Sequence, residues 1–447
     1  MRIPRTPPSP DALITEIGSE RYVEVLNAVR LSPLVNGKYI HWEKLRFLDT
    51  PPTISAEEWW LGIKFARAVL SRLLTELAPT NDRSFQYVLT DLAHEAFHKI
   101  DAQAAGRVSM PDAVANPSTR DRYLFNSLLE EAITSSQLEG AATTRREAQA
   151  MVRAGRNPRN RHEQMVLNNY RAMLFVREIK DTRLTPALVL EIHRIITNDT
   201  LDDPTAAGRL QTEADQRVVV DDTEGQVLHR PPPASELPER LEKMCRFANG
   251  VTEQGRFIHP VLRAIILHFW LAYDHPFADG NGRTARALFY WSMQSAGYWL
   301  VEYLSISRIL RDAPVRYATS FLEVETDDND LTYFIMYQLE TIKGAINEMN
   351  DYLVTKANEI REVEDLVQGI DLNHRQLALL GHALRNAGFR YTYRSHATSH
   401  AVTRQTARAD LLELTDLGIL DKRKSGREVV FIARDHLPDI IREMSNT

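Results

Sequence analysis

The sequence predicts a mainly helical protein with one short β-hairpin near its middle and a module of helices and a hairpin at its end. Three observations predict this fold class. Apolar residues recur at helical spacing through most of the chain, as they do over residues 261–274. Two short β-prone runs flank a turn-forming stretch within residues 217–230. The last part of the chain is basic, whereas the whole chain has a formal net charge of −6.

The length of the chain predicts its division into domains. At 447 residues, 43% of them hydrophobic, it is long enough for two or three domains with sizeable cores. We expect a helical N-terminal region over 1–115, a helical core over 116–355, a linker over 356–370 and a C-terminal module over 371–447. No apolar run approaches the ~18 residues of a membrane span, and the start lacks a signal-peptide core, so we expect no membrane contact and a cytoplasmic protein.

The N-terminal region opens with a proline-rich stretch and continues with helices. Ser55 is a predicted N-cap for a helix over residues 56–77. Residues 94–98, HEAFH, have the spacing that places two histidines on one helix face as zinc ligands. No third ligand is signalled nearby, and an amphipathic helix can present both histidines to solvent. We therefore favour surface histidines over a zinc site.

The core begins with a predicted helix over about 122–139 that ends at Gly140, a natural residue after a helix terminus. Glu139 falls in the last turn, where the helix dipole disfavours a carboxylate by about 0.3–1 kcal/mol unless a cation compensates. Arg286 is the candidate cation. Later helix starts are marked by a capping box or by proline in the first turn, at Thr144, Thr185 and His259. The single cysteine, Cys245, excludes an internal disulfide and is expected in the core of a helix over 236–249.

Residues 275–286, HPFADGNGRTAR, contain the strongest chemical signal of the chain. His275 follows the apolar helix over 261–274, so it is expected at a rim, where an imidazole of ordinary pKa about 6.5 can take a proton from a hydroxyl. Pro276 prevents the helix from continuing, and Phe277 is expected to anchor the loop to the core.

The second half of this segment combines groups that bind phosphate. Gly280-Asn281-Gly282 allows positive φ and presents successive backbone N–H groups at the start of the next helix, an anion-binding arrangement. Asp279 favours a phosphate only through a shared Mg²⁺. Arg283 and Arg286 lie on one helix face and can reach the outer phosphates of a nucleotide. Each part alone has an ordinary structural explanation, but their order without a gap favours a phosphate site.

This segment matches the signature of the Fic family, H-x-F-x-[DE]-G-N-G-R-x-x-R, at every specified position, and the chain resembles Fic proteins. Most Fic proteins transfer AMP from ATP to a hydroxyl side chain of a target protein. The resemblance implies a Fic-type helical core with a β-hairpin flap. It makes His275 the base and Asp279 the Mg²⁺ ligand. Asn281 with the N–H groups of Gly280 and Gly282 would stabilise the α-phosphate, and Arg283 and Arg286 would hold the β- and γ-phosphates.

Two further parts of the nucleotide site follow from the resemblance. The β-prone runs Arg217–Val220 and Gln226–Arg230, around a turn at 221–225, lie where Fic proteins carry the flap, whose edge holds the target by strand addition. Val218 is the candidate flap contact to the nucleotide, and Asp221 replaces a glycine found in many relatives. An ordinary surface hairpin is the alternative. Tyr317 is a candidate neighbour of the adenine, with packing between helices as the alternative.

The string from Ser135 to Gly140 matches the Fic inhibitory motif, [ST]-x-x-x-E-[GN], placed before the core as in class II. The resemblance implies that Glu139 pairs with Arg286 and excludes the γ-phosphate, so that the enzyme restrains itself. In some relatives the same glutamate aligns a water that removes AMP, and the sequence leaves the direction of the reaction open. The motif is short, and its position before this core is what favours it.

The C-terminal module has a local positive charge. Residues 375–434 contain 11 Lys/Arg and 5 Asp/Glu, a surplus of six. A helix near 373–386, a second helix from Thr403 and a strand pair around the turn at 424–427 predict a winged helix-turn-helix. If the module binds DNA, the residues facing a major groove are Thr403, Arg404, Gln405 and Arg408. Dimerisation or docking of another partner is the alternative, because such folds serve many functions.

We therefore predict a self-inhibited protein adenylyltransferase with ATP as substrate and Mg²⁺ as cofactor. Its target is a Ser, Thr or Tyr hydroxyl of another protein or of the chain itself. The alternative is a DNA-binding transcriptional regulator whose core only senses a nucleotide. We also expect a homodimer, an expectation that rests on no particular residue pattern.

Overall fold

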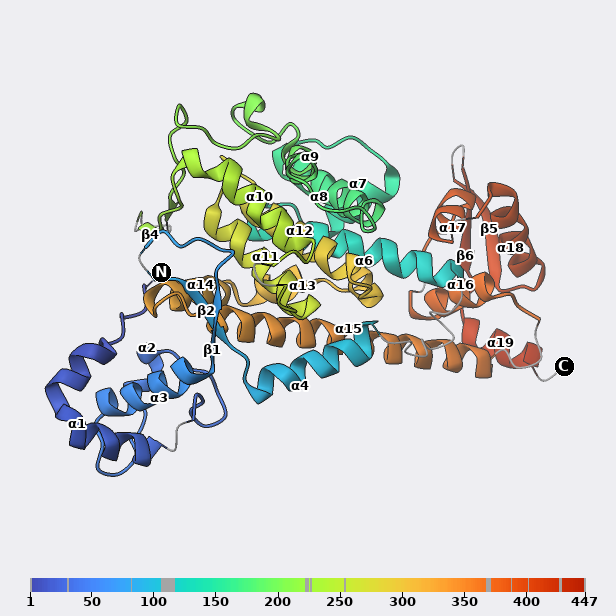
Figure 1. Cartoon of the computed structure of the whole chain (residues 1–447). Helices are drawn as coiled ribbons and strands as arrows, with labels where there is room; N and C mark the ends of the chain where they lie inside the picture. The colour runs from blue at the N-terminus through green and yellow to red at the C-terminus, as the bar shows by residue number, and fades with distance from the viewer. Residues whose placement is uncertain are drawn as a thin grey trace. The chain divides into compact units, whose positions relative to one another are not determined.

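A computed structural model of the chain describes residues 2–29, 32–81, 83–105, 117–221, 225, 227–252, 255–366, 371–386, 388–400, 402–425 and 428–445. The protein is mainly helical, as predicted, with three small antiparallel strand pairs in the described part (Figure 1). The chain forms two compact units. Unit 1 comprises residues 1–106 and 128–345, and unit 2 comprises residues 107–127 and 346–447.

The first elements of unit 1 contain a strand pair that the sequence did not predict. They are α1 (Pro10–Val29), α2 (Trp42–Leu45), α3 (Ala56–Leu70), β1 (Ser71–Leu74), β2 (Phe85–Val88), α4 (Asp91–Ile100) and the π-helix η1 (Asp101–Ala105). Ser55 caps α3 through a capping box with Glu58, as predicted. The predicted helix over 56–77 is wrong beyond Leu70, because Ser71 adopts an extended conformation and pairs with Val88. This pairing is a tertiary contact that helix propensity does not register.

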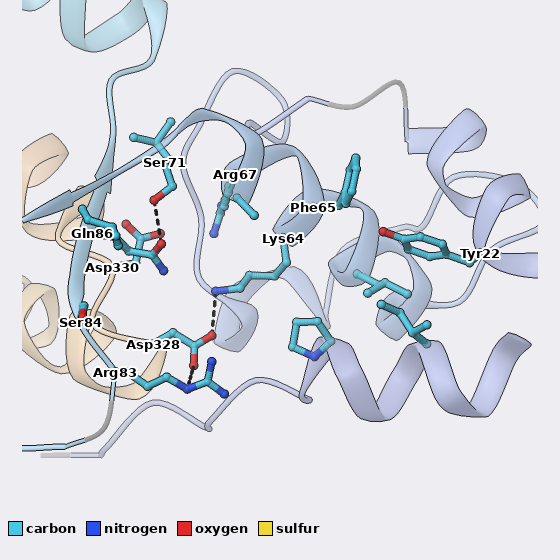
Figure 2. Close-up of a pocket in the computed structure, with 16 residues that line it drawn as sticks. Tyr22, Lys64, Phe65, Arg67, Ser71, Arg83, Ser84, Gln86, Asp328 and Asp330 are labelled. Carbon is cyan, nitrogen blue, oxygen red and sulfur yellow. Dashed lines mark hydrogen bonds and ion pairs between the residues drawn. The ribbon is translucent and has the colours of Figure 1, made fainter. Parts of the chain in front are cut away.

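Ion pairs, the most buried of them between Lys64 and Asp327, join α3 to the loop that precedes the last helix of unit 1, and Figure 2 shows the neighbouring pair of Lys64 and Asp328. The Nζ atom of Lys64 lies 2.7 Å from the Asp327 carboxylate and 3.2 Å from that of Asp328. One turn later the buried Arg67 donates a hydrogen bond to the Tyr333 hydroxyl at 2.7 Å. Because breaking a buried ion pair leaves an uncompensated charge, these contacts hold the N-terminal helices on the core.

The remaining elements build the core of unit 1 around α11 and α12, except that residues 117–127 of α6 and 346–366 of α15 belong to unit 2. The elements are α6 (Pro117–Leu138), α7 (Arg145–Ala154), α8 (Arg161–Glu178), α9 (Pro186–Thr197), η2 (Pro204–Ala206), η3 (Ala234–Glu236), α10 (Leu237–Ala248), α11 (Pro260–Asp274), α12 (Asn281–Ser295), η4 (Trp299–Tyr303), α13 (Ile306–Asp312), α14 (Pro314–Thr326) and α15 (Thr332–Leu366). The predicted starts at Thr144 and Thr185 are confirmed by side-chain caps, and Cys245 is buried in α10. Every helix in the described part is too short or too polar to cross a membrane.

The predicted hairpin is present but shorter than expected. Strand β3 (Val220–Asp221) pairs antiparallel with β4 (Val227–His229), so that Val220 lies opposite His229. Residues 217–219 were predicted as strand and are not: the Val218 N–H is directed to Gln211 Oε1 at 3.4 Å, and the Arg217 side chain attaches the segment to the carbonyl groups of Asp274 and His275. The turn residues 222–224 and Gln226 lie outside the described residues.

Unit 2 ends in a bundle of helices with a hairpin. Its elements are α16 (His374–Arg385), α17 (Tyr393–Ser399), α18 (Arg404–Asp416), β5 (Leu420–Ser425), β6 (Glu428–Ala433) and α19 (Leu437–Ser445). The predicted helices near 373–386 and from Thr403 are confirmed, with Asn373 and Thr403 as caps. The sequence missed α17, which Thr392 caps. Two residues of the predicted turn, 426 and 427, lie outside the described residues.

A buried carboxylate connects three helices of unit 2. Asp410 of α18 accepts hydrogen bonds from Arg375 at 2.7 and 2.8 Å, from Asn373 at 3.0 Å and from His396 at 3.0 Å. Burial opposes its ionisation, but these donors lower the pKa of Asp410 to about 2. The carboxylate is therefore charged at neutral pH and fixes α18 against α16 and α17.

We expect Asp410→Ala to destabilise unit 2 by about 3 kcal/mol, because Asn373, Arg375 and His396 all lose the buried carboxylate that accepts their hydrogen bonds. Hydrogen exchange of α16–α18 amides in the full chain measures the loss of protection. The control Asp416→Ala removes an exposed carboxylate from the same helix and should change stability by less than about 0.5 kcal/mol. Because the pKa of Asp410 is lowered on folding, its stabilisation is present above about pH 4 and is lost as the pH falls towards 2. Equal loss of protection in both variants contradicts this role.

Candidate active site

The signature segment forms the loop between α11 and α12. Helix α11 is buried on almost every face and ends at Asp274. The next residue, His275, has φ 45° and ψ 54°, the left-handed conformation typical of the residue that follows a helix. A residue other than glycine adopts this conformation only where the surroundings enforce it. The predicted position of His275 just beyond a helix end is confirmed.

The geometry of His275 defines its tautomer. Its Nδ1 atom lies 3.2 Å from the Ala272 carbonyl oxygen. A carbonyl only accepts, so Nδ1 carries the proton and Nε2 keeps its lone pair. Burial, together with the nearby His229 and Arg217, lowers the pKa of His275 to about 4. The imidazole is therefore neutral at pH 7, with Nε2 able to accept a proton.

The middle of the loop is held by contacts from α9 and from its own helix. The buried Phe277 ring stacks on His193, with ring centroids 3.7 Å apart. His193 accepts a hydrogen bond from the Gly208 N–H and so donates from Nε2 to the Asp279 carbonyl at 2.9 Å. The Asn281 amide bonds both backbone groups of Phe277, at 2.9 and 2.8 Å. Sequence reasoning missed His193, since its only signal was a histidine on an apolar helix.

Two arginines hold the start of the loop. Arg217 donates to the carbonyl oxygens of Asp274 at 2.6 Å and His275 at 2.7 Å. Arg240 donates to the buried Asp274 carboxylate at 2.6 and 2.9 Å. Arg217 also donates to the Pro232 carbonyl, which follows the hairpin. The base of the hairpin is thus attached to the loop that carries His275. No sequence motif predicted that Arg217 and Arg240 would bind this loop.

The two glycines at the start of α12 have no room for a side chain. Gly280 has φ 84°, and a Cβ atom there would lie 2.8 Å from the Thr197 side chain. A Cβ on Gly282 would collide with the Glu139 carboxylate and would lie 3.1 Å from Arg286 Nη1. Glu139 therefore already occupies the surface of this turn, where the helix N-terminus favours negative charge.

Arg283 is a buried cation without a strong partner. Its Nε atom has no hydrogen-bond acceptor among the described residues, and its Nη2 atom lies 3.4 Å from Asp279 Oδ1. Burial lowers its pKa despite the carboxylate. A guanidinium buried this way gains stability from an incoming anion, because an unmatched buried donor is costly.

Asp279 is the carboxylate expected to bind Mg²⁺. Its side chain is 43% exposed, and Oδ2 lies 3.7 Å from Arg161 Nη2. Within the described ranges, no group of three or more His, Cys, Asp or Glu side chains could hold a metal ion. A single accessible carboxylate fits Mg²⁺ that takes its other ligands from phosphates and water.

The predicted contact between Glu139 and Arg286 is present. Glu139 Oε1 lies 2.8 Å from Nη2 of Arg286, whose Nε also donates to the Ser135 hydroxyl at 2.8 Å. Gly140 has φ 86°, and its N–H donates to the Gln137 carbonyl. The N–H of the next residue reaches back to residue 136, which completes a Schellman motif at the end of α6. The predicted terminus at Gly140 is confirmed.

A second buried carboxylate positions α6 on the core. Glu131, one turn before Ser135, accepts hydrogen bonds from the hydroxyls of Tyr290 and Ser305, both at 2.9 Å. It also accepts from the hydroxyl of Ser307 and from its N–H at 3.1 Å. Burial raises the pKa of Glu131 despite these donors. The sequence did not signal it, because a helical glutamate is usually solvated.

The two remaining predicted contacts lie outside the loop. Val218 is half-buried just before β3, and its N–H lies 3.4 Å from Gln211 Oε1. The Tyr317 hydroxyl lies 2.8 Å from Nε2 of the buried His268, and its ring stacks near Tyr337. Burial raises the pKa of Tyr317 to about 12, with nearby Arg286 opposing the shift. Tyr317 therefore lies near Arg286, and its role beside an adenine stays a prediction, as does that of Val218.

The HEAFH segment lies on α4. His94, Glu95 and His98 are exposed, as the sequence favoured, and Glu95 pairs with Lys99 on the same helix. His94 packs edge-on against the Phe97 ring.

Comparison with known proteins matches this site. A family model described as the Fic/DOC family matches residues 183–293, which include the whole signature. The chain is 27% identical over 259 residues to a protein adenylyltransferase Fic of Nematostella vectensis, over 56% of each chain. It is 33% identical over 110 residues to a protein adenylyltransferase Fic of Drosophila mojavensis, over 25% of this chain and 19% of the relative.

A solved structure shares the fold. A Fic family protein from Desulfovibrio desulfuricans G20 superposes with a TM-score of 0.50 and 18% identity, covering 78% of this chain and 98% of that one. The chain spans about half of the first curated relative and about a fifth of the second. Residues 183–293 of this chain are therefore a Fic domain, homologous to the protein adenylyltransferases named Fic.

Proposed function

We propose that the protein transfers AMP from ATP to a hydroxyl side chain of a target protein. The observation that carries the proposal is a neutral His275, with Nε2 unprotonated, on the loop that leads into α12. In the first turn of α12 the buried Arg283 has only a 3.4 Å ion pair with Asp279, and its Nε atom has no acceptor among the described residues. A base beside a phosphate site is what hydroxyl attack on a nucleotide requires. The Fic domain and the printed names of the relatives support the same activity.

The proposed step transfers one group. The target hydroxyl oxygen attacks the α-phosphorus of ATP, and its proton passes to His275 Nε2. The bond from the α-phosphorus to the bridging oxygen breaks, and pyrophosphate leaves. Asn281 and the backbone N–H groups at the start of α12 would stabilise charge on the α-phosphate. Arg283 and Arg286 would hold the outer phosphates, so that catalysis rests on positioning and electrostatics.

We propose that Asp279 binds Mg²⁺ together with the nucleotide phosphates. Bound Mg²⁺ would neutralise negative charge on the leaving pyrophosphate. The carboxylate is accessible, and it accepts a hydrogen bond from the Gly280 N–H and forms two long ion pairs, to Arg283 and Arg161. Long, partly solvated pairs are easily replaced by a divalent cation.

We propose that Glu139 restrains the enzyme. Its carboxylate lies against Gly282 and pairs with Arg286, so an outer phosphate cannot contact both without displacing it. In class II Fic proteins, which the motif resembles, the equivalent contact blocks productive ATP binding. Glu139 also lies where a carboxylate can orient water, so removal of AMP from the target is a second expected activity. The target is expected to present Ser, Thr or Tyr, in another protein or in this chain.

We propose a winged helix for residues 371–445. Helices α16, α17 and α18 precede the hairpin β5–β6, and Tyr391 forms an isolated antiparallel bridge with Phe431 of β6. The alternative function was a DNA-binding transcriptional regulator whose core only senses a nucleotide. The comparisons do not support it, because the relatives are named for adenylyl transfer. The homodimer stays a prediction.

We expect Glu139→Gly to increase transfer of α-labelled AMP onto protein by about tenfold or more, because Arg286 is freed for phosphate. The double variant Glu139→Gly/His275→Ala should show no transfer, since no base remains. The matched control Glu178→Gly removes an exposed carboxylate at the end of α8 and should behave as wild type. Autoradiography after incubation with Mg²⁺ gives the readout. Equal labelling of all four proteins would falsify the assignment.

The low pKa of His275 predicts a distinct pH profile. Only the neutral imidazole accepts a proton, so transfer by Glu139→Gly should be lost as the pH falls through about 4 and should change little between about 5.5 and 7.5. A histidine of ordinary pKa would already lose half of its activity near 6.5. Initial rates at saturating ATP and Mg²⁺ separate the two cases. A midpoint near 6.5 counts against the buried, neutral base.

Removal of the Mg²⁺ ligand should have a local effect. In the Glu139→Gly background, Asp279→Ala should lower the transfer rate about 100-fold and remove the gain in ATP affinity that Mg²⁺ brings. Calorimetry of ATP binding with and without Mg²⁺ measures this gain. Asp202→Ala is the control, because Asp202 pairs with the same Arg161 at 3.1 Å but is almost fully exposed. If both variants lose the Mg²⁺ effect, the loss comes from Arg161 and not from metal binding.

A further inference from the structure

Helix α18 presents an unpaired polar and basic face at its start. Arg404, Gln405 and Arg408 are exposed, while Ala407 and Leu411 on the other side are completely buried. Neither arginine forms an ion pair with another described residue. The spacing of three and four residues places these side chains together on the solvent side of the first two turns. These side chains can donate hydrogen bonds to a bound molecule, and within the described residues neither arginine has a carboxylate to pair with.

The surrounding elements have the layout of a DNA-reading module. Helix α17 ends at Ser399, a short turn follows, and α18 begins after its cap at Thr403. Helix-turn-helix proteins place the second helix in the major groove, with its N-terminal residues at the base edges. The three exposed side chains lie at that end of α18. The hairpin β5–β6 follows α18 directly, as a wing does.

Helix α18 is also held rigidly, as base reading requires. The Asp410 carboxylate, six residues after Arg404, joins α18 to Arg375 of α16 and His396 of α17. Leu411 and Leu414 of the same helix are completely buried. Contacts on the inner side therefore fix the direction of the outer side chains, which lowers the entropy cost of binding.

Four more exposed cations in this unit have no ion pair with a described residue. They are Arg390, Arg394, Lys422 and Lys424. By contrast, Arg423 and Arg434 both pair with Asp421. The unpaired cations account for the local surplus of positive charge in a chain whose net charge is −6. Clustered unmatched cations of this kind attract the phosphate backbone of nucleic acid.

We propose that unit 2 binds duplex DNA. Helix α18 enters the major groove, where Arg404 and Arg408 read guanines and Gln405 reads adenine, and the four other cations contact phosphates. This property does not depend on adenylyl transfer, because none of these residues belongs to the nucleotide site. A double helix is favoured over a single strand because α17 and α18 expose no row of aromatic side chains for stacking bases among their described residues.

The test uses the full chain and a fluorescent 30-base-pair duplex library, from which the tightest-bound sequence is selected. Anisotropy then measures affinity for that duplex and for a scrambled one at several salt concentrations. With four phosphate contacts, log K should fall with log salt with a slope of about −4. Lys422→Ala/Lys424→Ala should reduce the slope by about 2 and weaken both duplexes alike.

Variants of α18 test base reading separately. Arg404→Ala/Arg408→Ala should lower the preference for the selected duplex at least tenfold. Arg404→Lys/Arg408→Lys keeps the charge and should keep the slope but lose the preference, because lysine lacks the paired donors of arginine. The control Arg146→Ala/Arg171→Ala removes two exposed arginines of α7 and α8 in unit 1 and should change nothing.

Two outcomes overturn the proposal. One is no salt-dependent binding by the wild-type chain at low salt, which would leave docking of another protein as the use of this face. The other is equal weakening by the α18 variants and the unit 1 control, which would mean that attraction is general. His275→Ala should bind DNA like wild type, so failure of adenylyl transfer and failure of DNA binding are distinguishable.

Discussion

The buried carboxylate of Asp274 and the two arginines around it are the constraint on which the candidate site depends. Helix α11 must end inside the core, where its last carbonyl groups and a negative side chain cannot reach bulk water. Arg240 neutralises the carboxylate, and Arg217 satisfies the carbonyl oxygens of Asp274 and His275. Without them the chain could not stop at this place, since each unmatched buried group costs on the order of 1–3 kcal/mol and a buried charge costs more. The left-handed conformation of His275 follows from this enforced stop.

The two arginines of the signature have different environments although they are three residues apart. Arg286 is fully matched by Ser135 and Glu139, whereas Arg283 has only long contacts and an orphaned Nε atom. Of these two arginines, Arg283 is the one whose guanidinium could still donate a hydrogen bond to a phosphate. In the proposed mechanism, Arg286 becomes available to a second phosphate only when the end of α6 releases it. A nucleotide could then bind before it is correctly placed.

The sequence was sufficient for the parts of the site that lie in one stretch of chain. One segment of twelve residues, 275–286, contains most of the candidate site, so spacing alone predicts that these residues lie together. They are His275, Asp279, Gly280, Asn281 and Gly282. The contact of Glu139 with Arg286 was predicted from a short motif and a helix terminus. His193, Arg217 and Glu131 were missed because each is an ordinary residue whose role arises only where distant elements meet. The same reason explains β1, where leucines compatible with a helix pair with a strand that begins eleven residues after β1 ends.

The absence of a side chain on Gly282 has a consequence for how the proposed restraint by Glu139 depends on nucleotide concentration. The Glu139 carboxylate lies directly against the first turn of α12, where a side chain on Gly282 would collide with it. In the proposed mechanism a phosphate has to displace this carboxylate. On that proposal, Glu139 is an intramolecular competitor of the phosphate, held at an effective concentration of the order of millimolar or higher by its helix. The proposed restraint would depend on the ratio of these two occupancies, and it would weaken whenever the last turn of α6 opens. The stability of that one helical turn would then set the activity as much as the groups proposed for catalysis do.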